Sequence, residues 1–228
     1  MSTPFKEPAR LPCRRMLVGM TGSVGIYDFL HYLAALKGTV TEDLRVIQTP
    51  DAARMLDARM TAKVADCEVW CDAWEDKAGV RMPHVHLPIW AEAFLIVPAT
   101  ANTVAAAAQG HASNLLQLAA LSYGRPIGFV PNMNDAMWMA PSTQRNVAQL
   151  LADGHLVLSQ GAGSGGGFAV GEQVSSAQSA PDPMTFKDFV LELIAASRGP
   201  AARPIPTAGE GDGHVSGPER RPSRTPAG

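Results

Sequence analysis

The sequence predicts an α/β protein built on a doubly wound parallel sheet with helices on both faces. Short apolar runs such as Phe94–Val97 and Ile127–Val130 lack the polar alternation of a half-exposed strand, so both faces of each strand should be buried. These runs alternate along the chain with segments whose apolar residues recur at helical spacing. Such alternation is typical of parallel sheets whose strands are joined by crossover helices.

Each element follows from a local pattern of apolar residues. Apolar runs predict strands, and apolar residues at every third or fourth position predict helices. The expected strands are 15–20, 44–47, 93–97, 127–130 and 155–159; the expected helices are 26–36, one that starts at Thr49-Pro50, 102–109, 113–122 capped by Ser113, 142–153 and 183–197. Thr49 suits an N-cap and Pro50 the first helical position. Residues 60–80 show no clear period.

The composition excludes several classes of function. A net charge of -2 leaves no broad basic surface, so we expect no nucleic-acid partner. No apolar run approaches the ~20 residues of a membrane span, and no apolar segment typical of a secretory signal follows the first basic residues. We therefore expect a cytoplasmic protein. The three cysteines Cys13, Cys67 and Cys71 do not make a disulfide framework. Cys67 and Cys71 lie in a stretch that favours helix and lack a second pair, so they predict two half-buried thiols and no metal site.

The chain divides into three parts. We expect an N-terminal extension over 1–14, one domain over 15–198, and a disordered tail over 199–228 that is rich in Pro, Gly, Ala, Arg and Ser. Within the domain, 159–181 contains the glycine-rich run 161–167, whose ordering costs much backbone entropy. A long loop of this kind inside a domain is typical of a lid or a binding element.

Small and polar residues follow the first expected strand in the turn Thr21-Gly22-Ser23-Val24-Gly25. Backbone N–H groups at the start of the next helix, with the hydroxyls of Thr21 and Ser23, can hold a phosphate. The turn matches neither GxGxxG nor a Walker loop. A plain tight turn remains the alternative.

Two further loops carry most of the polar chemistry. Pro98-Ala99-Thr100-Ala101-Asn102-Thr103 ends one apolar run, and Pro131-Asn132-Met133-Asn134-Asp135-Ala136-Met137-Trp138 follows another. Because ligands bind at the carboxyl ends of parallel strands, the loops share one crevice if their strands are neighbours. Asn102 has a simpler interpretation as an N-cap.

The amides of Asn132 and Asn134 suit a site that holds a carboxylate or a flavin edge without adding charge. The alternative is that Asn is present because it tolerates turns. Met133, Met137 and Trp138 suit core or interface packing.

His84 lies between two prolines in Met82-Pro83-His84-Val85-His86-Leu87-Pro88. Its side chain can act as a general base near neutral pH. If this segment is extended, His84 and His86 share one face, but no carboxylate or thiolate near them completes a metal site. A solvated histidine is the simpler alternative.

Together these motifs resemble those of the homo-oligomeric flavin-containing cysteine decarboxylases, which include peptidyl-cysteine decarboxylases of lanthipeptide biosynthesis and phosphopantothenoylcysteine decarboxylases. Pro98–Thr103 matches the PASANT motif with Thr100 for Ser, and Pro131–Trp138 matches PxMNxxMW at every specified position. His84 precedes Pro98 by fourteen residues, as the family's active-site His does. Gly110–Leu116 is similar to GxxDNLL, with Ser113 in place of Asp. The resemblance covers about residues 15–160.

The resemblance implies a Rossmann-like (flavodoxin-like) flavoprotein that binds FMN, or FAD, near a subunit interface of a trimer, with dodecamers of trimers in some members. It assigns Gly22, Ser23, Thr49, Thr100, Asn102, Thr103 and Met137 to the flavin. It makes His84 the catalytic base and Asn134 the carboxylate ligand, with Asn132, Met133 and Trp138 in the substrate pocket.

The implied reaction is oxidation of a Cys side chain by the flavin, followed by loss of carbon dioxide to leave an ene-thiol. Phosphopantothenoylcysteine decarboxylases place a reducing cysteine in the substrate clamp, whereas 159–181 contains none. The resemblance therefore favours a precursor peptide with a C-terminal Cys as substrate and lanthipeptide modification enzymes as partners. Coenzyme A biosynthesis and a non-catalytic regulatory flavoprotein remain the alternatives.

Overall fold

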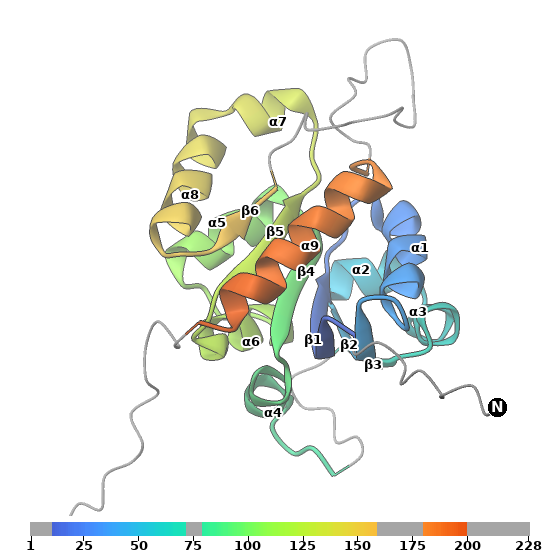
Figure 1. Cartoon of the computed structure of the whole chain (residues 1–228). Helices are drawn as coiled ribbons and strands as arrows, with labels where there is room; N and C mark the ends of the chain where they lie inside the picture. The colour runs from blue at the N-terminus through green and yellow to red at the C-terminus, as the bar shows by residue number, and fades with distance from the viewer. Residues whose placement is uncertain (1–10, 72–78, 159–179, 200–228) are drawn as a thin grey trace, which may run out of the picture.

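A computed structural model describes residues 11–71, 79–158 and 180–199 of the chain. Its strands form one parallel sheet in the order β3-β2-β1-β4-β5-β6 (Figure 1). The strands are β1 (Cys13–Met20), β2 (Thr41–Gln48), β3 (Glu68–Trp70), β4 (Ala93–Ala99), β5 (Ile127–Pro131) and β6 (Leu156–Val157). This is the Rossmann strand order, in which the direction of winding reverses between β1 and β4.

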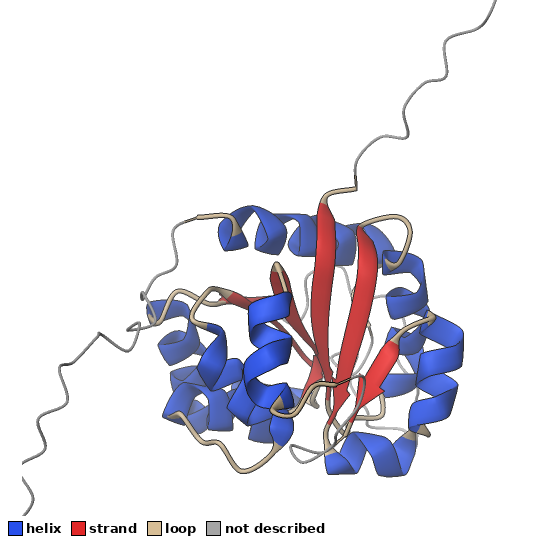
Figure 2. Cartoon of the chain, turned by 90° about the horizontal axis from the view of Figure 1, so that it is seen from below, coloured by secondary structure: helices blue, strands red, loops and turns tan. Residues whose placement is uncertain are grey.

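Helices cover both faces of the sheet (Figure 2). They are α1 (Ile26–Leu36), α2 (Pro50–Met55), α3 (Ala58–Ala65), α4 (Pro83–Trp90), α5 (Ala101–Gln109), α6 (Leu115–Tyr123), α7 (Asp135–Met139), α8 (Pro141–Ala152) and α9 (Pro183–Ser197). The helices α1, α3 and α9 pack on one face, and α4, α5, α6 and α8 contribute to the core on the other. The predicted doubly wound fold is confirmed.

The core consists of two clusters because successive strand residues point to opposite faces. Met16, Val18 and Met20 of β1 are buried against α1 and α9, whereas Leu17 is buried with α4 and α6. On the second face, Gly19 lets Leu116 approach the sheet, since a Cβ there would lie 2.3 Å from its Cδ1. Burial on both faces explains why the central strands β4 and β5 contain no polar side chain.

Most predicted elements are confirmed, with several differences. The segment that showed no clear period contains the end of α3 and the three-residue strand β3, which is too short to produce a pattern. Cys67 and Cys71 flank β3 rather than lying on a helix, and both are half-buried free thiols. The cap of α6 is Asn114, whose side chain accepts Gln117 N–H at 3.0 Å, and not Ser113. β1 begins at Cys13, two residues before the expected domain start.

Two predictions concern residues outside the described ranges. The expected clamp over 159–181 lies there except for its last two residues, and so does the expected tail except for Gly199. Within the described ranges, every helix is too short or too polar to cross a membrane.

Candidate active site

The polar loops predicted from the sequence meet at the carboxyl edge of the sheet. β4 and β5 are neighbours, and their register pairs Ala99 with Pro131, so the two loops leave the sheet side by side. The condition for a shared crevice is therefore met. After β1 the chain continues into α1 on one face, and after β4 into α5 on the other, which opens a crevice at this point.

The hydroxyl of Thr21 joins the end of β1 to the end of β4. It donates to the carbonyl oxygen of Pro98 at 2.6 Å and accepts the backbone N–H of Thr100 at 3.0 Å. The residue is only 1% exposed. Thr21 is therefore not a phosphate ligand, as the sequence had allowed; both of its hydrogen bonds are made within the protein.

The first turn of α5 presents unpaired donors to the crevice. Thr100 is its N-cap: its Oγ1 accepts Thr103 N–H at 3.3 Å and lies 3.0 Å from Thr103 Oγ1. The interpretation of Asn102 as the N-cap is wrong, and its side chain is exposed on the first turn. Because helix geometry provides no acceptor for the first N–H groups, those of Ala101 and Asn102 can bind a ligand.

The electrostatics of the edge favour α5 over the β1 turn as an anion site. Four strands at this edge are directly followed by a helix. Three of those helices carry an acidic residue in the first turn, Asp28 in α1, Asp51 in α2 and Asp135 in α7, whereas α5 carries none. A helix N-terminus attracts anions, and a carboxylate placed there repels them. A phosphate is therefore best accommodated at α5.

Gly22 and Thr49 support the loops locally. A Cβ on Gly22 would lie 2.6 Å from Asp51 Cβ, so only glycine allows this turn to approach α2. The predicted cap is confirmed: Thr49 Oγ1 accepts Ala52 N–H at 3.3 Å, and Pro50 occupies the first helical position.

Asn132 connects three loops of the edge. Its backbone N–H donates to Ala99 O at 2.9 Å, and its side-chain Oδ1 accepts the hydroxyl of Ser23. A Cβ on Gly25 would lie 2.8 Å from that same oxygen. Asn132 is 4% exposed, so its side chain is part of the scaffold between β1 and β5.

Asn134 begins α7, a five-residue helix that the sequence had suggested was a loop because so short a helix shows no period. Its Oδ1 accepts Met137 N–H at 2.9 Å, which leaves the side-chain NH2 free to donate elsewhere. Met133 is buried in the core, Trp138 packs partly against it, and Met137 is 45% exposed. The octapeptide thus supplies one half-buried amide and one exposed thioether at the edge.

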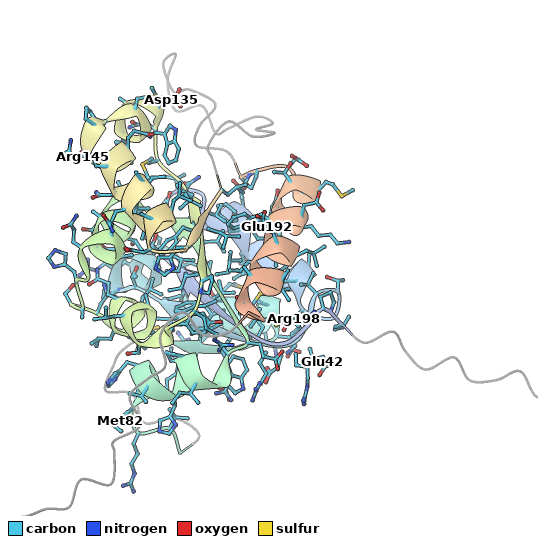
Figure 3. All side chains as sticks on the ribbon, turned by 60° about the vertical axis from the view of Figure 1, so that its left-hand side comes forward. Glu42, Met82, Asp135, Arg145, Glu192 and Arg198 are labelled. Carbon is cyan, nitrogen blue, oxygen red and sulfur yellow. The ribbon has the colours of Figure 1, made fainter. Side chains whose placement is uncertain are left out.

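His84 does not lie in this crevice. Its segment is the helix α4 and not an extended chain, so His84 and His86 do not share a face. Met82, two residues before His84, and Asp135, which follows Asn134, lie at opposite ends of the molecule (Figure 3). His84 is half-buried, and its Nδ1 is buried without a hydrogen-bond partner. The helix α4 directly precedes β4, so it lies at the amino edge of the sheet, whereas the polar loops follow β4 and β5 at the carboxyl edge.

The described residues contain no group of three His, Cys, Asp or Glu side chains able to hold a metal ion.

Burial raises the pKa of Cys67 to about 12, so its thiol stays protonated near neutral pH.

The sequence and the fold of the chain match those of known proteins. A model of the family described as Flavoprotein matches residues 5–174. The chain belongs to the Flavoprotein family. This flavoprotein is 34% identical over 145 residues to mersacidin decarboxylase from Bacillus sp., which covers 64% of the chain and 73% of that protein.

Solved structures of similar flavoproteins share the fold. The structure described as the FMN-dependent cysteine decarboxylase SpaF has 31% identity and a TM-score of 0.68, and covers 82% of this chain and 98% of SpaF. The structure of MrsD from Bacillus sp. has 28% identity and a TM-score of 0.66 over the same shares of the two chains. The bifunctional coenzyme A protein CoaBC of Mycobacterium tuberculosis is 34% identical over 154 residues, 68% of this chain and 36% of that longer protein.

Proposed function

We propose that this flavoprotein catalyses the flavin-dependent oxidative decarboxylation of the C-terminal Cys of a ribosomally made precursor peptide. The observation that carries the proposal is the free side-chain NH2 of Asn134 on a loop that leaves the sheet next to the turn into the uncharged first turn of α5, in a chain similar to mersacidin decarboxylase and SpaF. The ene-thiol product is a nucleophile for S-aminovinyl-cysteine formation. Its chemistry requires a partner enzyme that joins it to a dehydrated residue.

The residues of the crevice fit FMN. The N–H groups at the start of α5, with Asn102, would hold the phosphate; Ser23 lies on the loop after β1 and Thr103 in the first turn of α5. Met137 is exposed at the edge and would contact the ring system. When bound, the flavin accepts a hydride equivalent from the Cβ of the substrate Cys. The protein supplies binding, orientation and proton transfer.

Asn134 would hold the substrate carboxylate through its side-chain NH2. Its oxygen accepts Met137 N–H, and its NH2 group remains to donate to the ligand. A neutral donor stabilises the departing carboxylate less than an ammonium or guanidinium would. Loss of carbon dioxide therefore breaks only a weak ground-state interaction with the enzyme, which keeps the activation barrier of decarboxylation low.

His84 would accept the thiol proton, and we propose that it does so from a second copy of the chain. In one chain Met82, two residues before His84, lies at the opposite end of the molecule from Asp135, which follows Asn134 (Figure 3). Exposed apolar residues surround its helix, with Met82 52%, Ile89 65% and Leu121 62% exposed, and Met139 beside the crevice is 68% exposed. An interface between two different surfaces of the same chain makes a closed ring when its rotation closes. A trimer is the ring we propose, alone or assembled into a dodecamer.

A second candidate function is phosphopantothenoylcysteine decarboxylation, favoured by the identity with CoaBC. That reaction ends with reduction of an ene-thiol, and the chain contains no cysteine after Cys71 to act from the expected clamp. The peptide reaction needs no such reductant. For this reason we place it first.

Mass spectrometry of synthetic peptides tests the proposal. Peptides ending in Cys, incubated with the purified yellow protein, should lose carbon dioxide and two hydrogens. The same peptides with a C-terminal amide have no carboxylate to lose and should stay unchanged, as should the free acids with His84→Ala protein. If flavin is bound and no Cys peptide or precursor is altered, while phosphopantothenoylcysteine is decarboxylated, the second function replaces the first.

A further inference from the structure

Thr21 lies at the centre of the crevice and yet cannot touch a ligand. Its side chain is 1% exposed, and its hydroxyl is engaged with Pro98 O at 2.6 Å and Thr100 N at 3.0 Å. These two backbone groups flank Ala99 at the end of β4. One hydroxyl thus fixes both sides of the turn that leads into α5.

That turn determines where the first N–H groups of α5 point. Thr100 is the N-cap, and its backbone N–H is the group held by Thr21. Ala101 and Asn102 follow at once, so a shift of Thr100 moves both of their amides. A second link, Asn132 N to Ala99 O at 2.9 Å, joins this turn to β5 but leaves Thr100 itself untouched.

We infer that Thr21 is a positioning residue for phosphate recognition: its buried hydroxyl orients the N-terminus of α5 toward the phosphate of the flavin. This inference rests on the proposed flavin site. Loss of the hydroxyl leaves the Thr100 N–H without its acceptor, so that N–H and the α5 amides beside it can turn away from the ligand. Binding of the flavin phosphate should weaken, whereas binding of the isoalloxazine ring should not change.

The test compares binding of FMN and of riboflavin, which lacks the phosphate, to apoprotein of the full chain by flavin fluorescence quenching. In Thr21→Val, which preserves shape without the hydroxyl, FMN affinity should fall about tenfold or more while riboflavin affinity stays within about twofold. Thr21→Ser retains the hydroxyl and should keep the native preference for FMN. Thr21→Cys, whose thiol is a weak donor and a weak acceptor, should have an FMN affinity between those of Thr21→Val and Thr21→Ser. It takes the place of Thr21→Val if that variant does not fold.

Thr61→Val is the matched control, because Thr61 is also fully buried and its hydroxyl accepts Gln48 Nε2 at 3.1 Å, away from α5. It should lower stability without changing the preference for FMN over riboflavin. Equal losses of both ligands in Thr21→Val, or no loss of either, would overturn the positioning role. Wild-type protein that binds no flavin would instead overturn the proposed function, and the inference with it.

Discussion

The side-chain oxygen of Asn134 accepts the backbone N–H of Met137 at 2.9 Å, so one residue caps α7 and keeps its side-chain NH2 free to donate. The two roles can be separated by substitution. Aspartate is as good an N-cap as asparagine, but it offers the substrate a negative charge instead of a donor.

We therefore expect Asn134→Asp to fold with nearly unchanged stability and to lose at least about a hundredfold in kcat/KM, since juxtaposed like charges cost several kcal/mol. Asn134→Ala should lose activity and, in addition, about 1 kcal/mol of stability through the missing cap. Urea unfolding and mass-spectrometric kinetics on a Cys peptide measure the two effects. Full activity in Asn134→Asp would remove Asn134 from carboxylate binding.

His84 and Asn134 should complement each other between copies of the chain. Protein with His84→Ala and protein with Asn134→Ala should each be inactive, whereas co-expression of the two should restore roughly one quarter of wild-type activity. That fraction is the share of interfaces in a random ring that receive an intact His84 from one copy and an intact Asn134 from the next.

The control for this experiment co-expresses His84→Ala with the double variant His84→Ala/Asn134→Ala, which offers no intact histidine and should stay inactive. Differently tagged subunits show that mixed oligomers have formed. If mixed oligomers form and have no activity, the site is not shared between copies.

Gly22→Ala should reduce flavin loading as well as stability. The new Cβ would lie 2.6 Å from Asp51 Cβ, and relieving that overlap costs about 1–3 kcal/mol and displaces the turn beside the crevice. Gly154→Ala is the control: its φ is +86° and nothing lies within 4 Å, so only backbone strain of about 1–2 kcal/mol results. The flavin absorbance per protein should fall in Gly22→Ala alone, and an equal fall in both would contradict the local explanation.

His155 should make the fold less stable in mild acid. Its Nδ1 accepts the N–H of Ile127 at 3.2 Å, and burial lowers its pKa below the ordinary value. The unfolded chain therefore binds a proton more readily than the folded chain, so stability is fully present above about pH 6.5 and declines as pH falls below it.

Urea unfolding at pH 7.5 and pH 5.5 measures this dependence. The difference in unfolding free energy between the two pH values should shrink in His155→Gln, which cannot be protonated. His111→Gln, at an exposed histidine, is the control and should leave the difference unchanged. An undiminished difference in His155→Gln would assign the acid sensitivity to other groups.

Local chemistry explains why much of the fold could be predicted. Apolar runs marked β1, β2, β4 and β5, and Thr49 before Pro50 marked the start of α2, because each signal lies within a few consecutive residues. The strand β3 and the helix α7 were missed because three and five residues are too few for a period to appear. Ser113 was predicted as the N-cap of α6, but its neighbour Asn114 occupies that position. Both residue types are good N-caps, so local sequence cannot decide between them.

The sequence by itself determined the parallel sheet, the loops that carry the polar groups and the identity of the residues in them, because these depend on side-chain type and short spacing. Only the tertiary structure decided their roles. Pairing β1 with β4 brought the Thr21 hydroxyl to Pro98 O and buried it, so that a possible ligand became a support. The helix α4 lies at the edge where β4 begins, whereas Asn134 follows the end of β5 at the other edge. Strand order and the edge at which a helix lies are long-range properties, set by the burial of both faces of the sheet and not by any local run of residues.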